Sequence, residues 1–566
     1  MKYRTPLQRG KRMLRRLAAA VSVSVVLLLE PAFGQSAPSF QATAVKQSPF
    51  RKSVEQISVP QLKDYLSFVA ADEMEGRSTP SRGLDTTARF IATMLARGGV
   101  KPAGDDGTYF QRIVLKREKL AAEGAEVSLG TQKFVHGKDF FVSAVAANVS
   151  GGLVYGGDGW YIKAKNVDAY EGLDPKGKIV VLAGASGRLP RGISFNEMSS
   201  LGTRGEDWMD PAAYAQKKGA VAVVILTPLL QQANSEALEA QRTRLEGGRL
   251  APEKLGAPAA SLPVVYANLR LAQALFAREK VDAATLLEGG SGGTAPKPFA
   301  LSADKQFEIS VKTVTERVPS QNVVGIVEGS DPELKGEYVA FGAHYDHSGT
   351  RPEAQGDTIL NGADDDGSGT VALMAMAEAL SKSSQRPRRS AIFVWHMGEE
   401  MGLWGSEYFA RFPTVPIEKI VAQLNIDMIG RTRVAGDSNP RNKDLSGPNE
   451  VYVIGSKMMS TELGALSEAV NDAFLKLSYN YKYDDPKDPE RFFYRSDHIH
   501  YARKGIPIIF YFTGVHADYH QPSDEVSKID FAKFEKITKS IYATFWEIAD
   551  LKSRPKVDKG LPAEAR

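Results

Sequence analysis

Seven of the eight histidines in this chain of 566 residues lie between residues 344 and 520, in a segment that also carries paired carboxylates. The segment NGADDDGSG (361–369) has three adjacent aspartates, whose charges repel unless a cation lies among them. Because the chain contains no cysteine, thiol catalysis and thiolate ligation are excluded. A metal would have to be held by His, Asp and Glu side chains, and the histidine-rich segment offers all three.

Polar residues stand where apolar runs end. The run YVAFGAH ends at His344 and is followed by Asp346, SAIFVWHM leads into Glu399-Glu400, IVAQLNID ends at Asp427, and IPIIFYFTG leads into HADYH (516–520). Near-continuous apolar runs separated by helical patterns predict an α/β fold with a mostly parallel sheet, buried on both faces. Ligands of such sheets bind at the carboxyl ends of the strands, so these side chains are expected to meet.

Each of these residues also has an ordinary structural explanation. A single histidine at a strand end is commonly hydrogen-bonded, a Glu pair can stabilise a helix N-terminus, and the aspartates can cap the helical pattern GSGTVALMAMAEAL that follows them. Together, however, they supply five candidate ligands: His344, Asp364, one glutamate of the pair 399–400, Asp427 and a histidine of the segment 516–520. Such a set fits two divalent ions about 3.5–4 Å apart that share one carboxylate. A carboxylate that binds neither ion must then act as general base, and one of the adjacent pair Glu399-Glu400 can supply it.

The rest of the chain divides into segments with different sequence patterns. Residues 59–98 have two helical patterns around the loop ADEMEGRSTPSRG, and residues 126–295 alternate short strand-like runs with Gly/Pro turns, as in a small β-rich inserted domain. The stretch GGSGGTAPKP (289–298) is typical of a linker. We therefore expect a leader at 1–34, a first part of the main domain at 35–125, the insert at 126–295, the main catalytic part at 296–552 and a tail at 553–566.

The first 34 residues are typical of a secretory signal peptide. They have a basic start, an apolar run of 13 residues and small residues near Gly34; an uncleaved membrane anchor is the alternative. They carry a net charge of +6, so the remaining chain has a net charge of −2, against +4 overall. We expect an exported protein, periplasmic or extracellular, without stable membrane insertion after cleavage and without affinity for nucleic acid.

Six motifs, in this order, resemble those of the dinuclear zinc aminopeptidases of metallopeptidase family twenty-eight, which also has bacterial leucyl aminopeptidases and glutamate carboxypeptidase as relatives. They are HYDH, NGADDDGSG, GEEMGLWGSEYF, LNIDMIG, YRSDH and YHQPSDEV. The resemblance covers roughly residues 59–125 and 300–550 and implies the zinc exopeptidase fold. GLDPKGKIVVL and AAYAQKKGAVAVVIL resemble a protease-associated (PA) domain, which would be the insert.

The resemblance implies two Zn²⁺ ions with a shared ligand. His344, Asp364 and Asp427 would hold one ion, and Asp364, Glu400 and His520 the other, which makes Asp364 the bridge. Asp365 and Asp366 would be partners of the following helix. A cis peptide bond is expected between Asp364 and Asp365.

The catalytic roles follow from the same resemblance. Glu399 would be the general base on a water that bridges the ions, Asp346 would orient His344, and Tyr519 would stabilise the oxyanion. The five other histidines of the segment match no ligand position, so they are expected to be structural or to line the pocket: His347, His396, His498, His500 and His516.

The function expected on these grounds is that of a secreted or periplasmic aminopeptidase acting on peptides, with apolar N-terminal residues the favoured substrates. A carboxypeptidase acting on acidic dipeptides stays open, because Arg431 and Arg433 follow Asp427 closely. A glutaminyl cyclase and a non-catalytic receptor-like binding protein on the same fold are further alternatives. Neither the oligomeric state nor the role of the PA domain follows from the sequence.

Overall fold

The computed structural model describes residues 42–183, 189–190, 193, 197–198, 201–256, 261–288, 296–351 and 356–561. The predicted leader at 1–34 and most of the predicted linker lie outside these ranges. None of the helices within them is both long and apolar enough to cross a membrane.

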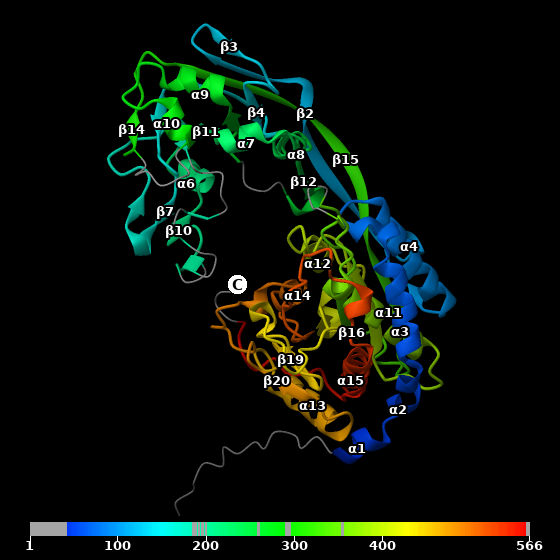
Figure 1. Ribbon diagram of the computed structural model, residues 1–566. Helices are drawn as coiled ribbons and strands as arrows, with labels where there is room; N and C mark the ends of the chain where they lie inside the picture. Colours follow the sequence, from blue (N-terminus) through cyan, green and yellow to red (C-terminus); the bar gives the residue numbers. More distant parts are fainter. Residues whose placement is uncertain are drawn as a thin grey trace, which may run out of the picture. The chain divides into compact units, whose positions relative to one another are not determined.

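A twelve-stranded mixed sheet forms the centre of the fold (Figure 1). Four parallel neighbours, β17, β16, β18 and β21, lie in its middle, and the pairs β15/β17 and β19/β21 are antiparallel. The path of the sheet runs β12 (Arg249–Pro252), β2 (Phe110–Leu129), β15 (Phe307–Val327), β17 (Ser390–His396), β16 (Tyr338–His344), β18 (Ile420–Ile426), β21 (Ile508–Phe512), β19 (Glu450–Ile454) and β20 (Ser478–Asn480). Three short strands pair beside this path: β1 (Lys101–Pro102), β3 (Gln132–Phe134) and β5 (Ala147–Gly151).

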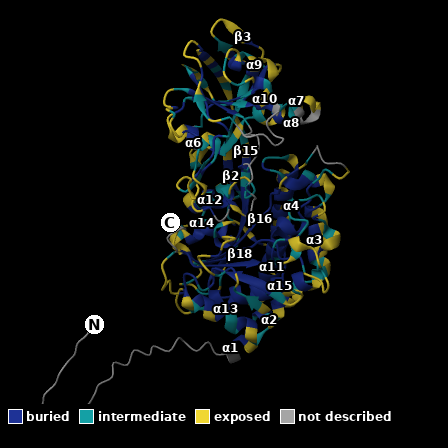
Figure 2. Cartoon of the chain, turned by 60° about the vertical axis from the view of Figure 1, so that its left-hand side comes forward, coloured by how far each residue is buried: buried dark blue, intermediate teal, exposed yellow. Residues whose placement is uncertain are grey.

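Both faces of the central strands are buried, because successive side chains of a strand point to opposite faces. In β17, Phe393 and Trp395 pack into one core while Ile392 and Val394 pack into the other. Figure 2 shows the strands around β16 and β18 as buried. The predicted α/β fold with a mixed sheet flanked by helices is thereby confirmed.

Helices cover each face of this sheet. The first core contains side chains of α3 (Val59–Val69), α4 (Arg82–Arg97), α11 (Gly369–Ser381), α13 (Thr461–Ala473) and α15 (Phe531–Asp550). The second contains side chains of α12 (Trp404–Arg411) and α14 (His498–Ala502). Two short helices, α1 (Ala42–Gln47) and α2 (Phe50–Ser53), precede α3. The expected helical patterns at 59–98 correspond to α3 and α4.

Residues 140–300 form a second sheet of six strands, with the order β14 (Phe299–Ala300), β6 (Leu153–Tyr155), β9 (Ile179–Ala183), β11 (Ala222–Leu226), β13 (Val264–Ala267) and β4 (Phe140–Val142). A three-stranded sheet lies in the same segment: β10 (Trp208–Met209), β7 (Tyr161–Ile162) and β8 (Val167–Asp168). The helices of the segment are α6 (Pro211–Lys217), α7 (Leu229–Ala233), α8 (Ser235–Glu246), α9 (Leu269–Phe276) and α10 (Ala283–Glu288).

The long antiparallel pair of β2 and β15 belongs to both parts of the chain (Figure 1). Ile113 and Val323 pack into the first core of the large sheet, whereas Val127 and Ile309 pack into the core of the 140–300 segment. The predicted boundary between residues 125 and 126 therefore falls inside β2, a strand that continues from one core into the other.

Candidate metal centre

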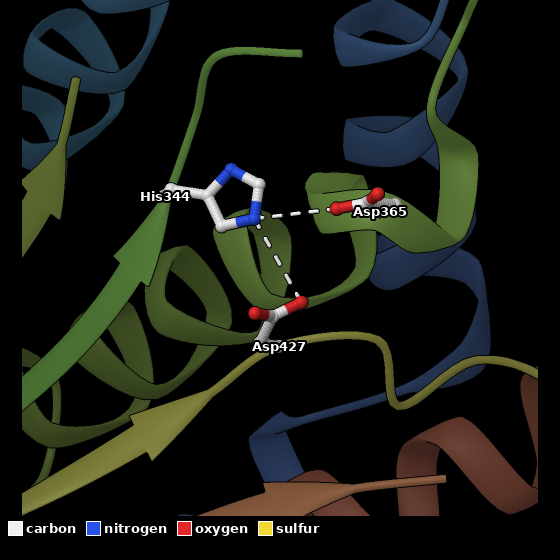
Figure 3. Close-up of side chains that lie close together, drawn as sticks. All are labelled: His344, Asp365 and Asp427. Carbon is white, nitrogen blue, oxygen red and sulfur yellow. Dashed lines mark ion pairs between the residues drawn. The ribbon is translucent and has the colours of Figure 1, made fainter. Parts of the chain in front are cut away.

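The ends of neighbouring strands bring the acidic and histidine side chains together. His344 is the last residue of β16, Asp427 directly follows β18, and Asp365 lies in the turn that precedes α11 (Figure 3). The Nε2 atom of His344 lies 3.3 Å from Oδ1 of Asp365 and 3.7 Å from Oδ1 of Asp427. The three side chains form the first group of possible metal ligands.

A second group lies on the other carboxylate oxygen of Asp365. The Nε2 atom of His520 lies 3.2 Å from Oδ2 of Asp365 and 3.2 Å from Oε2 of Glu400. His347 also belongs here, because its Nδ1 atom lies 2.8 Å from Oε1 of Glu400. Asp365 is thus the residue common to both groups.

The expectation for Asp364 is wrong by one position. Its Oδ1 atom accepts a hydrogen bond of 2.6 Å from the N–H of Gly430, and its Oδ2 atom lies 3.2 Å from Nε2 of His516. Neither group of possible ligands contains Asp364. The backbone of the turn directs the Asp364 and Asp365 carboxylates to different partners, which three identical adjacent residues cannot reveal in a sequence.

The third aspartate does what was expected of it. Oδ1 of Asp366 accepts a hydrogen bond of 2.8 Å from the N–H of Gly369, the first residue of α11. Its Oδ2 atom accepts the N–H of His344 at 3.2 Å, so it also ties this helix to the end of β16. The cis peptide bond joins Asp365 and Asp366, not Asp364 and Asp365 as expected.

Glu399 lies beside the ligand groups without belonging to either of them. Its Oε2 atom is 4.0 Å from Nε2 of His344. Burial, together with the neighbouring carboxylates of Asp427 and Glu400, raises the pKa of Glu399 well above its usual range. A carboxylate so placed can accept a proton and hold it.

Asp346 holds both His344 and Glu399 in place. Its carbonyl oxygen lies 3.1 Å from Nδ1 of His344, and its Oδ1 atom lies 3.7 Å from the same nitrogen. Oδ1 also accepts a 3.1 Å hydrogen bond from the N–H of Glu399, and Thr79 donates to Oδ2 at 3.2 Å. The structure thus brings Asp346 to His344 as expected, with the backbone carbonyl as the closer partner.

Arg77 is a residue of the site that the sequence did not single out. Its fully buried guanidinium donates hydrogen bonds of 2.7–3.0 Å to four backbone carbonyls, those of Val69, Tyr345, Asn361 and Gly362. These bonds connect the loop after His344 with the turn that carries Asp365. The loop ADEMEGRSTPSRG contains Arg77, but sequence alone does not show which arginine of a polar loop is buried.

The other histidines separate into two kinds. His396 lies 2.9 Å from the Tyr501 hydroxyl, and Nε2 of His498 lies 2.8 Å from the carbonyl of Phe493, so both are held in the core. His516 contacts Asp364, as described above. His347 differs from these three, because it enters the second ligand group although it was expected to be structural or to line the pocket.

The donor set fits two zinc ions. With Zn–N and Zn–O distances of about 2.0–2.2 Å, the ligand atoms of a tetrahedral site lie about 3.3–3.6 Å apart. The ligand pairs of His344 and His520 span 3.2–3.7 Å. Within the described residues, Oδ2 of Asp365, Oε1 of Glu400 and both ring nitrogens of His347 are buried without a hydrogen-bond partner. Atoms of this kind, beside several buried carboxylates, are expected where cations bind.

A pocket opens beside these carboxylates. Asp365, Glu399 and Asp427 form part of its wall. Arg495 and Ser496 are polar members of the remaining wall. Its other members are largely apolar or aromatic: Met428, Phe492, Phe510, Phe512, Val515 and Tyr519. The ring of Tyr519 stacks on His520 at 3.9 Å between centroids. Burial and the nearby carboxylates raise the pKa of Tyr519, which keeps its hydroxyl protonated.

Comparison with known proteins agrees with this site. Residues 322–545, which contain every residue of the two ligand groups, match the profile of peptidase family M28. The part of the chain that carries the site is therefore similar to peptidase family M28, as the motifs led us to expect.

Individual relatives are more distant. A probable leucine aminopeptidase of Arthroderma benhamiae is 27% identical over 233 residues, which are 40% of this chain and 57% of that protein. The aminopeptidase NAALADL1 of Mus musculus is 31% identical over 168 residues, 28% of this chain and 21% of that one. The chain thus spans little more than half of the first of these relatives. The solved aminopeptidase of Aneurinibacillus sp. strain AM-1 has a TM-score of 0.48 at 18% identity, over 90% of this chain and 97% of that one.

Proposed function

We propose that the protein is a zinc-dependent aminopeptidase that hydrolyses the first peptide bond of its substrates. The observation that carries this proposal is the position of Asp365, whose two oxygens face separate histidines while Glu399 lies beside them and outside both groups. Bound zinc would polarise the scissile carbonyl and lower the pKa of water.

The protein's own side chains account for the remaining steps. Glu399 accepts the proton of the attacking water and passes it to the leaving amine. The carboxylate of Asp346 keeps Glu399 in place by accepting the backbone N–H of Glu399. The protonated hydroxyl of Tyr519 donates a hydrogen bond to the carbonyl oxygen as negative charge develops there. The aromatic wall of the pocket favours a large apolar side chain in the residue that is released.

The carboxypeptidase alternative has less support. Arg431 donates to Asp518 at 2.8 Å and also lies 3.6 Å from Asp524, so nearby carboxylates already compensate its charge. Arg433 is exposed and donates to the carbonyl of Lys443. Neither arginine belongs to the wall of the pocket. The presence of two ligand groups and of Glu399 beside them likewise favours an enzyme over a receptor-like binding protein.

Two other expectations are proposals that rest on the sequence alone. Export depends on the leader at 1–34, and the assignment of residues 126–295 as a PA domain depends on its two motifs.

The test of the function is hydrolysis of leucine p-nitroanilide by the purified protein. Activity is expected to disappear with a chelator, to return with Zn²⁺, and to fall by about 10²–10⁴-fold in Glu399→Gln. Glu407→Gln is a matched control, because Glu407 lies on α12 and pairs with Arg411. An acetylated substrate should resist cleavage. Activity that ignores the chelator, or an unimpaired Glu399→Gln variant, contradicts the proposal.

A further inference from the structure

His347 occupies a position in the second ligand group that a structural histidine would not need. Its side chain is fully buried, and its Nδ1 atom lies 2.8 Å from Oε1 of Glu400 and 3.8 Å from Oδ2 of Asp365. The ring packs edge-on against that of His520, with 5.5 Å between centroids. Two imidazoles and two carboxylates thus enclose one small volume.

The hydrogen bonding of His347 also distinguishes it from the buried histidines of the core. His396 and His498 each have a partner for one ring nitrogen, namely the Tyr501 hydroxyl and the Phe493 carbonyl. Neither ring nitrogen of His347 has a hydrogen-bond partner among the described residues, and its short contact with Glu400 is not aligned as a hydrogen bond. Buried polar atoms without partners are costly, and a shared cation satisfies an imidazole and a carboxylate that are close but not aligned with each other.

The backbone makes room for this ring. Gly362 has a φ of +56°, and a Cβ atom placed on it would lie 2.5 Å from Cγ of His347. A side chain at this position would collide with the imidazole. The N–H of His347 also donates to the carbonyl of Arg77 at 3.2 Å. The absence of a side chain at Gly362 leaves room for the ring, whose Nδ1 atom faces the second ligand group.

We propose that His347 is a fourth protein ligand of the second zinc ion, through Nδ1, together with Asp365, Glu400 and His520. This proposal rests on the proposed function only in taking zinc as the metal. It makes the two positions unequal, because the first retains three protein ligands, His344, Asp365 and Asp427. A zinc site with three protein ligands keeps a position open for water or substrate, whereas four protein ligands close it. The ion held by His347 therefore binds more tightly and exchanges more slowly than the ion at the first position.

The first test uses a cysteine substitution, for which this chain gives no background because it has no cysteine. Cobalt(II) bound by a thiolate shows an intense sulfur-to-metal charge-transfer band in the near ultraviolet. Since Nδ1 is one bond beyond Cγ and a metal–sulfur bond is longer than a metal–nitrogen bond, Sγ of a His347→Cys variant lies within reach of the ion. The band is expected in cobalt-loaded His347→Cys and is expected to be absent in the control His498→Cys.

The second test counts histidines on the native protein. X-ray absorption of the protein with two zinc ions is expected to show three imidazoles for the two ions, against two if only His344 and His520 bind. Titration with Zn²⁺ should show one of two sites weakened by more than about 100-fold in His347→Ala, because losing a group that only orients a ligand costs about 10–100-fold. Binding by the control His498→Ala should be unchanged.

A count of two imidazoles in the wild-type protein overturns the proposal, whatever the variants do. A loss within 10–100-fold in His347→Ala without the charge-transfer band also overturns it, and makes His347 an orienting group for Glu400. None of these readouts depends on turnover. A protein that binds zinc through three histidines yet cleaves no aminoacyl substrate would contradict the proposed function and leave this inference standing.

Discussion

Asp364 and Asp365 are adjacent in the chain, but their carboxylates belong to different networks. Asp365 lies between His344 and His520, at 3.3 and 3.2 Å from their Nε2 atoms. Asp364 accepts the N–H of Gly430 and lies against His516. The turn before α11 thus sends one carboxylate to the candidate metal centre and the other into the protein interior.

This relationship predicts opposite outcomes for two similar substitutions. Asp365→Asn removes the charge shared by both ligand groups, and we expect it to abolish the binding of two zinc ions and the activity. Asp364→Asn retains an oxygen that can accept from Gly430, so zinc stoichiometry should be unchanged and activity should fall by less than about tenfold, or about 1.4 kcal/mol. Metal analysis after dialysis measures both. Normal zinc content in Asp365→Asn would show that Asp365 is not the shared ligand.

Tyr519→Phe should affect turnover more than binding. The variant keeps the ring that stacks on His520 but loses the hydroxyl that we propose as the donor to the developing oxyanion. We expect kcat to fall by about 10²–10³-fold, with KM changed by only a few fold, since removal of one oxyanion donor has an effect of this size. Steady-state kinetics with leucine p-nitroanilide provides the measurement. An equal loss confined to KM would instead assign the hydroxyl to substrate binding.

Asp524 holds the turn that carries Asp365. Its buried Oδ2 atom accepts the N–H groups of Asp364 and Asp365 at 3.0 and 3.2 Å. Asp524→Ala leaves two buried donors without partners, at a cost of about 1–3 kcal/mol each, so the free energy of unfolding should fall by about 2–5 kcal/mol. Asp524→Asn retains an acceptor oxygen, so its free energy of unfolding should fall by less. Denaturant unfolding of both variants tests this order, and equal stability of Asp524→Ala and wild type would exclude it.

Because Lys533 is buried, we expect the free energy of unfolding to rise at alkaline pH. Burial lowers the pKa of its ammonium group to about 8, although Asp364 and other carboxylates oppose the shift. Between about pH 8 and 10.5 the unfolded chain then binds a proton that the folded chain has released, so the free energy of unfolding increases with pH. The full difference is about 3 kcal/mol.

The Lys533→Met variant isolates this contribution. Its side chain cannot titrate, so the wild type should gain about 3 kcal/mol relative to the variant between pH 7 and 10.5. Urea unfolding of the two proteins at several pH values gives this difference, and most other titrating groups cancel in it. A difference that stays constant with pH would mean that Lys533 titrates alike in both states.

The sequence was sufficient to predict the residue types of the candidate site and the strands that carry them. His344, Asp427 and Glu400 follow apolar runs that become β16, β18 and β17, because near-continuous apolar runs are stable only where both faces of a sheet are covered. The α/β fold follows from the same patterns. The lack of cysteine reduced the possible metal ligands to three residue types.

Tertiary structure decided which of several equivalent residues occupies each position. Asp364, Asp365 and Asp366 are chemically identical side chains, and only the path of the backbone through the turn assigns one to Gly430, one to the candidate metal centre and one to the N-terminus of α11. The positions of His347 and Arg77 also depend on tertiary packing. The ring of His347 lies against Gly362, and the guanidinium of Arg77 donates to the carbonyl of Gly362, which is far away in sequence. The chemistry of a side chain is encoded locally, whereas its direction depends on long-range packing that local sequence does not contain.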